Sequence, residues 1–253
     1  MAQQAGRLAG KAAFITGAGG GLGEAIAKAM ADEGANVGLL DYNGELVETA
    51  ASNIPEGRGT PYTVDVSDRL AVKAAIDDFA ERQGGLNILV NNAVSFNYGT
   101  LPDMAEDVVD HMLDVGLKGV FWSLQAATPH LIASKGGSII NLSSIAVSFA
   151  IKNAGIYTSI KGAIDALTRQ QAGELGEYGI TVNALAPGSV VTPGASSVIS
   201  AESWKDRAAS TMLKRLATPE EIAAAAVFLA SDDARSITGV TLKIDAGVTI
   251  AGV

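Results

Sequence analysis

Cysteine is absent from this 253-residue sequence, and histidine occurs only twice, as His111 and His130. Without thiolates the chain has no disulfides and no cysteine-ligated metal site, which suits a reducing compartment. The two histidines lie far apart on one predicted helix, so they are poorly spaced to share a metal ion. We therefore predict a cytoplasmic protein with no metal site.

Positive charge and long apolar runs are also scarce. Lys and Arg number 18 against 27 Asp and Glu, a net charge of −9, and no basic cluster is present. This balance excludes an ordinary nucleic-acid partner. The longest apolar run, Ile222 to Ala230, is much shorter than the roughly 20 residues that span a bilayer. Hydrophobic residues still make up 48% of the chain, enough for a large buried core.

Short apolar runs alternate with longer stretches of helical periodicity along the whole chain, and no linker or repeat divides it. This alternation predicts one α/β domain over residues 1–253, with a parallel sheet covered by helices on both faces. The predicted strands are Ala12–Thr16, Asn36–Leu40, Tyr62–Val66, Ile88–Asn91, Ser138–Leu142, Thr181–Ala186 and Val240–Ile244. The first predicted helix carries Leu22, Ile26, Ala29 and Met30 on one face and is closed by Gly34. Further helices are predicted from Glu45 to Asn53, Ser67 (as N-cap) to Arg82, Met104 to Leu131 and Gly155 to Tyr178, and a last one begins with a capping box at Thr218.

One segment breaks this rhythm. Residues 192–217 connect a strand to the capped helix, and such long connections in compact domains are usually functional. We interpret the segment as a lid over a site, with an unstructured surface loop as the alternative.

A glycine-rich run, TGAGGGLG at residues 16–23, joins the first strand to the following helix. Glycines in this context let the backbone turn sharply and approach a pyrophosphate at the helix N-terminus. The run alone is weak evidence, but a strand before it and an amphipathic helix after it support a dinucleotide site.

Asp41 ends the second predicted strand. A carboxylate at this place can accept hydrogen bonds from the adenosine ribose and repels a 2′-phosphate. Asp is also common in turns and helix caps. No Lys or Arg lies between Val37 and Arg58 to attract a phosphate, so we predict NAD rather than NADP.

Tyr157 and Lys161 lie four residues apart on one predicted helix, which places both side chains on the same face. Lowering a tyrosine pKa from about 10 to about 7 requires roughly 4 kcal/mol of preferential phenolate stabilisation. A close ammonium and a positively charged nicotinamide ring can supply much of that. Ser144 directly follows the fifth strand, at the sheet edge where sites form in such folds.

Together these residues resemble the short-chain dehydrogenase/reductase family over about residues 10–247. The matching motifs, in order, are TGAGGGLG (16–23), Asp41, Asp65-Val66, Asn91-Asn92-Ala93, Ser144, Tyr157-x-x-x-Lys161 and Pro187-Gly188-Ser-Val-Val-Thr192. The resemblance implies a Rossmann-like, doubly wound domain with a seven-stranded parallel sheet, and a homotetramer.

The resemblance also implies roles for individual residues. Ser144, Tyr157 and Lys161 would be catalytic: Tyr157 as the general acid or base, Lys161 lowering its pKa and holding the nicotinamide ribose, and Ser144 holding the substrate oxygen. The implied cofactor-binding residues are Gly17, Gly20, Gly21, Leu22, Gly23, Asp41, Asp65, Val66, Asn92, Tyr157, Lys161, Val190 and Thr192.

Some positions depart from the family pattern. Gly116, in Asp114-Val-Gly-Leu-Lys-Gly119, stands where the family has an Asn that holds a proton-relaying water. A glycine leaves room for another water but has no amide to fix it. Val94, Val147 and Ala246 replace common glycines, which we interpret as variation in packing and pocket shape.

We therefore predict an NAD-dependent oxidoreductase that transfers a hydride between nicotinamide and a small to medium, partly apolar secondary alcohol or ketone. Phe96, Phe149, Trp204 and Met212 lie in loops expected near the substrate, although loop aromatics often simply pack. Two alternatives stay open: an acyl-carrier ketoreductase, which usually has a basic residue where Gly20 stands, and a catalytically silent NAD-binding regulatory protein.

Overall fold

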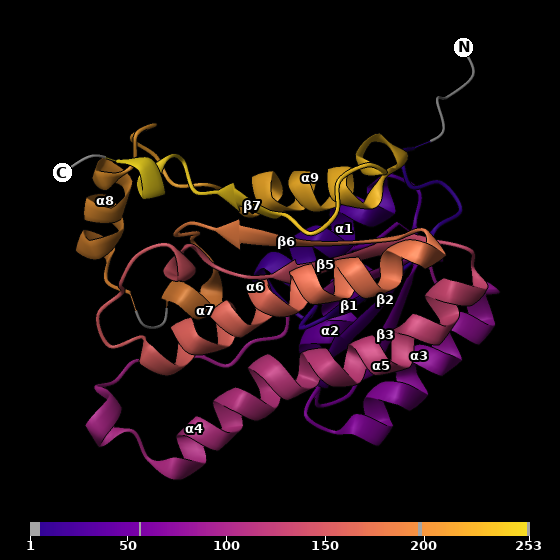
Figure 1. Ribbon diagram of the computed structural model, residues 1–253, viewed down its shortest axis with the longest axis horizontal. Coiled ribbons are helices and arrows are strands. Elements are labelled where there is room, and N and C mark those ends of the chain that lie inside the picture. The colour runs from indigo at the N-terminus through magenta and orange to yellow at the C-terminus, as the bar shows by residue number, and fades with distance from the viewer. Residues whose placement is uncertain (1–5, 56, 197–198, 252–253) are drawn as a thin grey trace.

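A seven-stranded parallel sheet with the strand order β3-β2-β1-β4-β5-β6-β7 forms the centre of the molecule (Figure 1). The computed structural model describes residues 6–55, 57–196 and 199–251. The strands are β1 (Ala12–Thr16), β2 (Asn36–Asp41), β3 (Gly59–Thr63), β4 (Ile88–Asn91), β5 (Gly137–Leu142), β6 (Ile180–Pro187) and β7 (Thr241–Ile244). The predicted fold class is confirmed.

The order of the strands determines where a ligand can bind. After β3 the chain returns to the other side of β1, where β4 pairs in parallel with β1. The connections therefore leave β1 and β4 in opposite directions, and a crevice opens at the carboxyl ends of these two strands. Every residue of β1 and β4 is buried, as expected for central strands covered on both faces.

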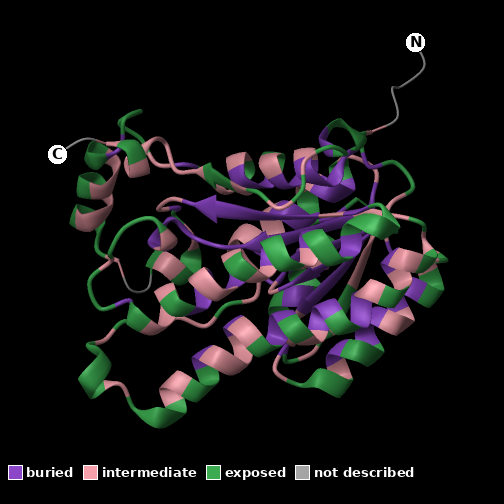
Figure 2. Ribbon diagram, in the orientation of Figure 1, coloured by how far each residue is buried: buried purple, intermediate pink, exposed green. Residues whose placement is uncertain are grey.

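Helices cover both faces of the sheet (Figure 1). On one face α1 (Gly21–Asp32) packs against α9 (Pro219–Ala230), and α2 (Gly44–Ser52) joins the same core. On the other face lie α3 (Arg69–Gln83), α5 (Gly119–Ala133) and α6 (Gly155–Leu175). Figure 2 shows the result, with buried residues concentrated on the strands and on the inward faces of these helices.

The capping box predicted for α9 is confirmed. The Thr218 side chain accepts a hydrogen bond from the backbone of Glu221, whose carboxylate accepts one from the Thr218 backbone, and Pro219 occupies the first turn. This reciprocal pairing satisfies backbone donors that the helix itself leaves unpaired.

The third strand and the helix after it begin elsewhere than predicted. β3 starts at Gly59 and includes Pro61, which an edge strand tolerates because one side of its backbone faces solvent. Asp65 and Val66 therefore lie in the turn after the strand. The N-cap of α3 is Asp68 and not Ser67, because the Asp68 carboxylate accepts hydrogen bonds from the first-turn backbone.

The long helix predicted from Met104 to Leu131 is divided. α4 (Glu106–Leu113) runs into a π turn at Asp114–Lys118, and α5 continues from Gly119. The segment 192–217 contains α7 (Pro193–Ser196) and α8 (Ala201–Ser210), so it is not an unstructured loop. Short 3₁₀ turns lie at Leu101–Asp103, Ile145–Val147, Gly176–Tyr178, Asp232–Ala234 and Val248–Ile250.

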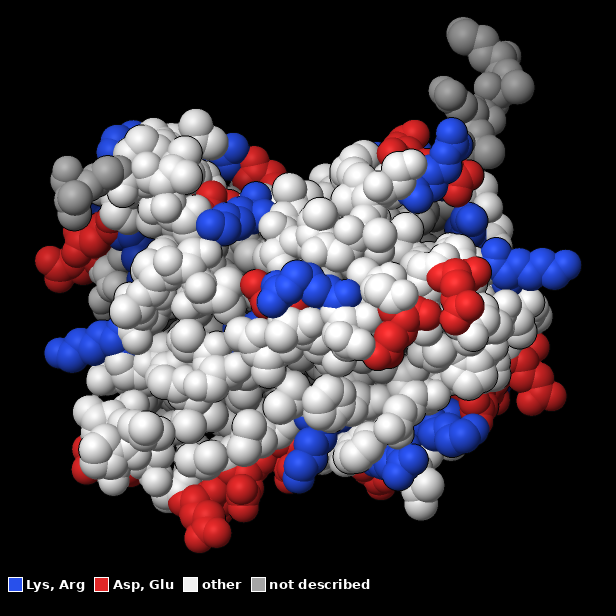
Figure 3. All heavy atoms as spheres, viewed as in Figure 1, with Lys and Arg blue, Asp and Glu red and all other residues white. Residues whose placement is uncertain are grey.

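Lys and Arg side chains are scattered among acidic ones on the face shown in Figure 3, as expected from the net charge. Within the described ranges, no helix has the length and apolar character needed to cross a membrane.

Candidate active site

A cavity of about 1000 Å³ opens at the carboxyl ends of the strands. Its wall combines the glycine loop, the ends of β2, β4, β5 and β6, the start of α6 and the helices of the segment 192–217. The structure brings almost all the predicted site residues into this one wall: Gly17, Gly20, Gly21, Leu22, Asp41, Asp65, Val66, Asn92, Ser144, Tyr157, Lys161, Val190 and Thr192. Gly23 is the predicted residue that does not line it.

The glycine loop needs glycine at some positions and not at others. Gly17 has a φ of +64°, and a Cβ there would stand 2.8 Å from the Cα of Ala93. A Cβ on Gly23 would stand 2.1 Å from the carbonyl oxygen of Gly17, so Gly23 lets α1 pack closely beneath the loop rather than contacting a ligand. Gly20 differs, because its backbone is extended and a Cβ would meet no atom within 4 Å.

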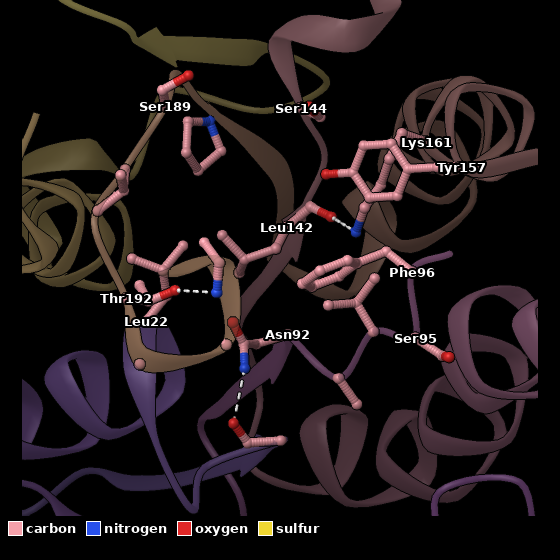
Figure 4. Close-up of a pocket in the computed structure, with 18 of the residues that line it drawn as sticks. Leu22, Asn92, Ser95, Phe96, Leu142, Ser144, Tyr157, Lys161, Ser189 and Thr192 are labelled. Atoms are coloured by element: carbon pink, nitrogen blue, oxygen red, sulfur yellow. Dashed lines mark hydrogen bonds between the residues drawn. The ribbon is translucent and has the colours of Figure 1, made fainter. Parts of the chain in front are cut away.

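Asn92 braces this loop from the end of β4. Its side-chain amide donates to the carbonyl oxygens of Thr16 (3.0 Å) and Gly17 (2.8 Å), and its backbone N–H donates to the Thr16 hydroxyl. The bond to a glycine-loop carbonyl is among those drawn near Asn92 in Figure 4. Asn92 thus fixes the loop that faces the cavity.

Asp41, which the sequence predicts to meet the adenosine ribose, is held by two backbone donors. One carboxylate oxygen accepts from the backbone N–H of Gly19 (3.0 Å) and the other from that of Asn43 (3.1 Å). An ionised carboxylate has about four acceptor sites, so acceptor capacity is left for a ligand hydroxyl. Asp65 and Val66 line the same cavity, and the Asp65 carboxylate accepts from the backbone and hydroxyl of Ser67.

The segment after β6 closes the opposite wall. Val190 pairs with Ala217 in an isolated bridge, which ties the two ends of the segment 192–217 together. Thr192 lies over the glycine loop, with its methyl group 3.5 Å from where a Gly21 Cβ would stand. Its hydroxyl oxygen accepts from the backbone N–H of Ala195 (3.2 Å), as Figure 4 shows, and its hydroxyl proton is still able to donate.

Ser144, Tyr157 and Lys161 meet in the cavity (Figure 4). Tyr157 and Lys161 rise from the first turns of α6, and Ser144 follows β5. The Lys161 Nζ lies 5.8 Å from the centre of the Tyr157 ring and donates to the carbonyl oxygen of Leu142 at 2.6 Å. Spacing and strand position in the sequence thus predicted a real cluster.

The pKa values of this cluster follow from its enclosure. Burial, the largest effect, raises the pKa of the Tyr157 phenol, and a hydrogen bond with Ser144 partly offsets it. This direction is opposite to the lowering expected from Lys161. Burial also lowers the pKa of Lys161 to about 8, so its ammonium is still charged at neutral pH. Additional positive charge beside the phenol would therefore be needed to bring the pKa of Tyr157 down toward neutral pH.

Gly116 lies buried in the π turn between α4 and α5. A Cβ there would stand 3.1 Å from the side chain of Ile160, the residue before Lys161 in the sequence. The π turn therefore interrupts the helix at the position where Gly116 replaces the family's Asn.

The apolar lining agrees with the sequence in part. Phe96, Phe149 and Trp204 line the cavity, whereas Met212 packs beside Gly247 instead. Tyr98 was missed, and its ring lies 6.4 Å from that of Tyr157. Arg207 was also missed. The i, i+3 spacing of Trp204 and Arg207 is the signal that could have found it, once a helix is recognised there.

The cavity has the features that a nicotinamide dinucleotide requires. The glycine loop offers backbone without side chains beside the N-terminus of α1, which attracts a pyrophosphate. Ser143, only 3% exposed, lines the cavity with a hydroxyl that has no hydrogen-bond partner among the described residues. The donor set therefore fits such a cofactor.

The histidines are separate, as the sequence predicts. His130 contacts Asp77 through its Nε2 at 2.8 Å, and His111 is exposed at the wall of the cavity. Among the described residues, no group of three or more His, Asp or Glu side chains is placed to hold a metal ion.

Known proteins share the sequence and the architecture of this chain. Residues 17–249 match the family model described as enoyl-(acyl carrier protein) reductase. The chain is 39% identical to the oxidoreductase UcpA of Escherichia coli K12, with 97% of each chain covered, and 37% identical to meso-2,3-butanediol dehydrogenase of Serratia marcescens, with 96% of each covered. The structure of carveol dehydrogenase from Mycobacterium avium in complex with NAD matches with a TM-score of 0.91 at 31% identity, over 97% of this chain and 99% of that one. The chain belongs to the short-chain dehydrogenase/reductase family of oxidoreductases.

Proposed function

We propose that this protein is an NAD-dependent dehydrogenase/reductase that interconverts a secondary alcohol and the corresponding ketone. One observation carries the proposal: Ser144, Tyr157 and Lys161 face the same cavity as the glycine loop. When bound, a nicotinamide dinucleotide would accept a hydride from the carbinol carbon, or donate one to a carbonyl carbon.

The chain's own residues handle the proton. Tyr157 takes the hydroxyl proton in oxidation and returns it in reduction, as a general base and acid. Ser144 holds the substrate oxygen by a hydrogen bond. Lys161 keeps a positive charge beside the phenol, and its Nζ is positioned by the carbonyl of Leu142. That charge favours the phenolate and so opposes the effect of burial.

The charges at the adenosine end favour NAD. Asp41 presents a carboxylate there, and Lys161 and Arg207 are the lysine and arginine side chains in the described cavity wall. Lys161 belongs to the cluster with Tyr157, and Arg207 lies on α8, so neither comes from the strand ends beside Asp41. A 2′-phosphate would therefore meet a negative charge without a compensating cation.

The substrate end is partly apolar. Phe96, Phe149 and Trp204 line it, and the segment 192–217 contributes α8 to the wall, which suits a lid. The names of the relatives, a butanediol dehydrogenase and a carveol dehydrogenase, are consistent with a small to medium alcohol. We propose a single domain over residues 1–253, a homotetramer and a cytoplasmic location as further parts of this assignment.

The two alternatives make different predictions. An acyl-carrier ketoreductase gains support from the description of the matching family model, but Gly20 offers no cation for NADP. A catalytically silent protein has no chemical reason to keep Ser144, Tyr157 and Lys161 together.

The test is a screen of secondary alcohols and ketones with NAD and NADP, followed at the reduced-nicotinamide absorbance band. NAD should support turnover better than NADP. Tyr157→Phe removes only the hydroxyl, so turnover should fall by about 10²- to 10⁴-fold while NAD still binds. Near wild-type turnover in this variant, or equal use of NADP by the wild type, would count against the assignment.

A further inference from the structure

Arg207 on α8 is a cation in the cavity wall that the proposed reaction does not use. Its Nη1 donates to the Ser189 hydroxyl at 3.1 Å, and its Nε donates to the Ser203 hydroxyl at 3.3 Å. The guanidinium carbon lies 5.9 Å from the centre of the Trp204 ring. Two neutral hydroxyls and an aromatic face thus hold the guanidinium in place.

The charge of Arg207 has no acidic partner among the residues that the structure describes. Arg215 forms a bidentate pair with Glu221, and two guanidinium nitrogens of Arg7 donate to one oxygen of Glu33. Arg207, in contrast, has no carboxylate within ion-pair distance in the described parts of the chain. The acidic residues of the cavity wall are Glu24, Asp41, Asp65 and Asp245. Asp245, which follows β7, is engaged instead by the backbone of Gly247 and by Thr249.

A guanidinium carries five N–H donors in a fixed fork, and the two hydroxyls use only two of them. No hydrogen bond of Nη2 to a described residue is present. The group is permanently charged and half-buried, so it offers planar, charge-assisted donation to a ligand.

The position of Arg207 assigns this donation to the substrate. Ser189, which holds Nη1, lies across the cavity from the Tyr157 ring in Figure 4. Phe149, Ile199 and Trp204 line the cavity as well. A ligand that places its reacting carbon at Tyr157 and extends toward Ser189 would bring its far end to the guanidinium.

We propose that Arg207 binds a carboxylate at the end of the substrate away from the reacting carbon, so that the substrates are secondary hydroxy acids and the corresponding keto acids. This rests on the proposed function. A single guanidinium balances the one charge of a carboxylate, whereas a phosphate monoester carries nearly two negative charges at neutral pH and no second cation lies beside Arg207 in the described wall. The carboxylate takes no part in the hydride transfer and sets specificity only.

The kinetic test uses matched substrates. Straight-chain 2-, 3-, 4- and 5-hydroxy acids are compared with their amides and with hydroxyalkyl phosphates, in the wild type and in Arg207→Gln and Arg207→Lys. Losing a hydrogen bond to a charged group should lower kcat/KM for the preferred acid by about tenfold to a hundredfold in Arg207→Gln, mainly through KM. The amide should change by less than about threefold on the same reasoning, and Arg207→Lys should recover part of the loss.

Lys205→Gln on the exposed face of α8 is the matched control, because it removes one positive charge from the same helix outside the cavity wall. It should leave the acid-to-amide ratio unchanged. An Arg207→Gln effect that is equal for acids and amides, or that appears in the KM for NAD with every substrate, would overturn the proposal, as would a preference for the phosphates.

A binding measurement separates this proposal from the proposed function. The chain has two tryptophans, so Trp122→Phe leaves Trp204, beside Arg207, as the only one. Butanoate, hexanoate and benzoate should change its fluorescence saturably, and their amides should not. Arg207→Gln should abolish the response. A saturable response without turnover on any alcohol would refute the proposed function alone; no saturable response, or the same response in Arg207→Gln, would refute the carboxylate site.

Discussion

Lys161 combines a polar function with an apolar environment. Its ammonium is buried, and the hydrogen bond to the Leu142 carbonyl is the polar contact it makes with the described residues. Burial holds its pKa near 8, well below the ordinary value. Keeping a charge in this position at neutral pH therefore destabilises the folded state by at most about 3 kcal/mol, a cost of the kind that active sites retain for function.

Replacing this lysine should stabilise the protein in a pH-dependent way. Below pH 8 the lysine is charged in both states, so Lys161→Met should raise Tm at pH 7 by about 5 °C, after allowing for the unpaired Leu142 carbonyl. Between pH 8 and about 10.5 the folded lysine loses its proton before the unfolded one, so the wild type gains stability and the difference shrinks. Thermal unfolding of both proteins at pH 7, and again at a pH between 8 and about 10.5, measures this difference. Lys152→Met, at an exposed site, is the control and should show no such trend.

Cofactor preference can also be changed at single residues. Asp41→Ser removes the charge at the adenosine end, and Gly20→Arg introduces a cation at a position with extended backbone and open space. The double variant should lower the ratio of kcat/KM for NAD to that for NADP by about a hundredfold, with each single change contributing part.

Gly19→Arg is the contrasting control for this pair. A Cβ at Gly19 would stand 2.9 Å from the Asp41 carboxylate, so this variant should disturb the loop and weaken both cofactors. If Gly20→Arg behaved in the same way, the proposed opening at Gly20 would be wrong.

Element boundaries show how far a sequence predicts such a fold. Central strands such as β1 and β4 were predicted residue for residue, because each is a short run of residues buried on both faces of the sheet. β3 was misplaced toward Val64 and Val66, which have high β propensity, whereas pairing with β2 begins at Gly59. Strand pairing is a tertiary interaction, and local propensity does not contain it.

The candidate site shows the same limit. Glycines, Asp41 and the Tyr157–Lys161 pair were predictable because each follows a strand or repeats at helical spacing. Arg207 was not, since α8 has no buried residue and hence little apolar periodicity to mark it as a helix. The π turn around Gly116 likewise has no sequence signal in an otherwise helical pattern.

The π turn offers a test at the scale of an element. Gly116→Asn restores the family's residue, but its Cβ would meet Ile160 at 3.1 Å. We expect a loss of about 1–3 kcal/mol from this overpacking. Ile160→Ala removes the Cγ2 that makes the contact, so the double variant should lose less stability than the two single variants together. Turnover of the double variant should stay within about tenfold of the wild type, a barrier change of ~1.4 kcal/mol, because Ser144, Tyr157 and Lys161 are unchanged.

Thermal unfolding and turnover of the four proteins in this cycle measure the coupling. Additive effects of the two substitutions would show that Ile160 does not constrain position 116. A gain in turnover above a hundredfold with Asn would instead mean that the wild type lacks an essential relay group.

At the scale of the whole molecule, two surfaces outside the cavity wall expose apolar side chains. Phe121 on α5 is 37% exposed, and Leu242 on the edge strand β7 is 37% exposed beside Val240. Within the described ranges β7 pairs with β6 alone, so its other edge carries backbone groups that no described strand pairs with. Two such surfaces on different sides of a chain can build a tetramer with two kinds of symmetric contact.

This arrangement predicts how the proposed tetramer comes apart. Phe121→Glu and Leu242→Glu each bury a charge at one contact, so each should convert the tetramer into a dimer, and the double variant should be monomeric. Light scattering coupled to size-exclusion chromatography measures the masses. Thr49→Glu on the exposed face of α2 adds the same charge elsewhere and should leave the mass unchanged. A wild type that is monomeric would exclude the tetramer, and dimers from Thr49→Glu would show that net charge, not these two contacts, controls assembly.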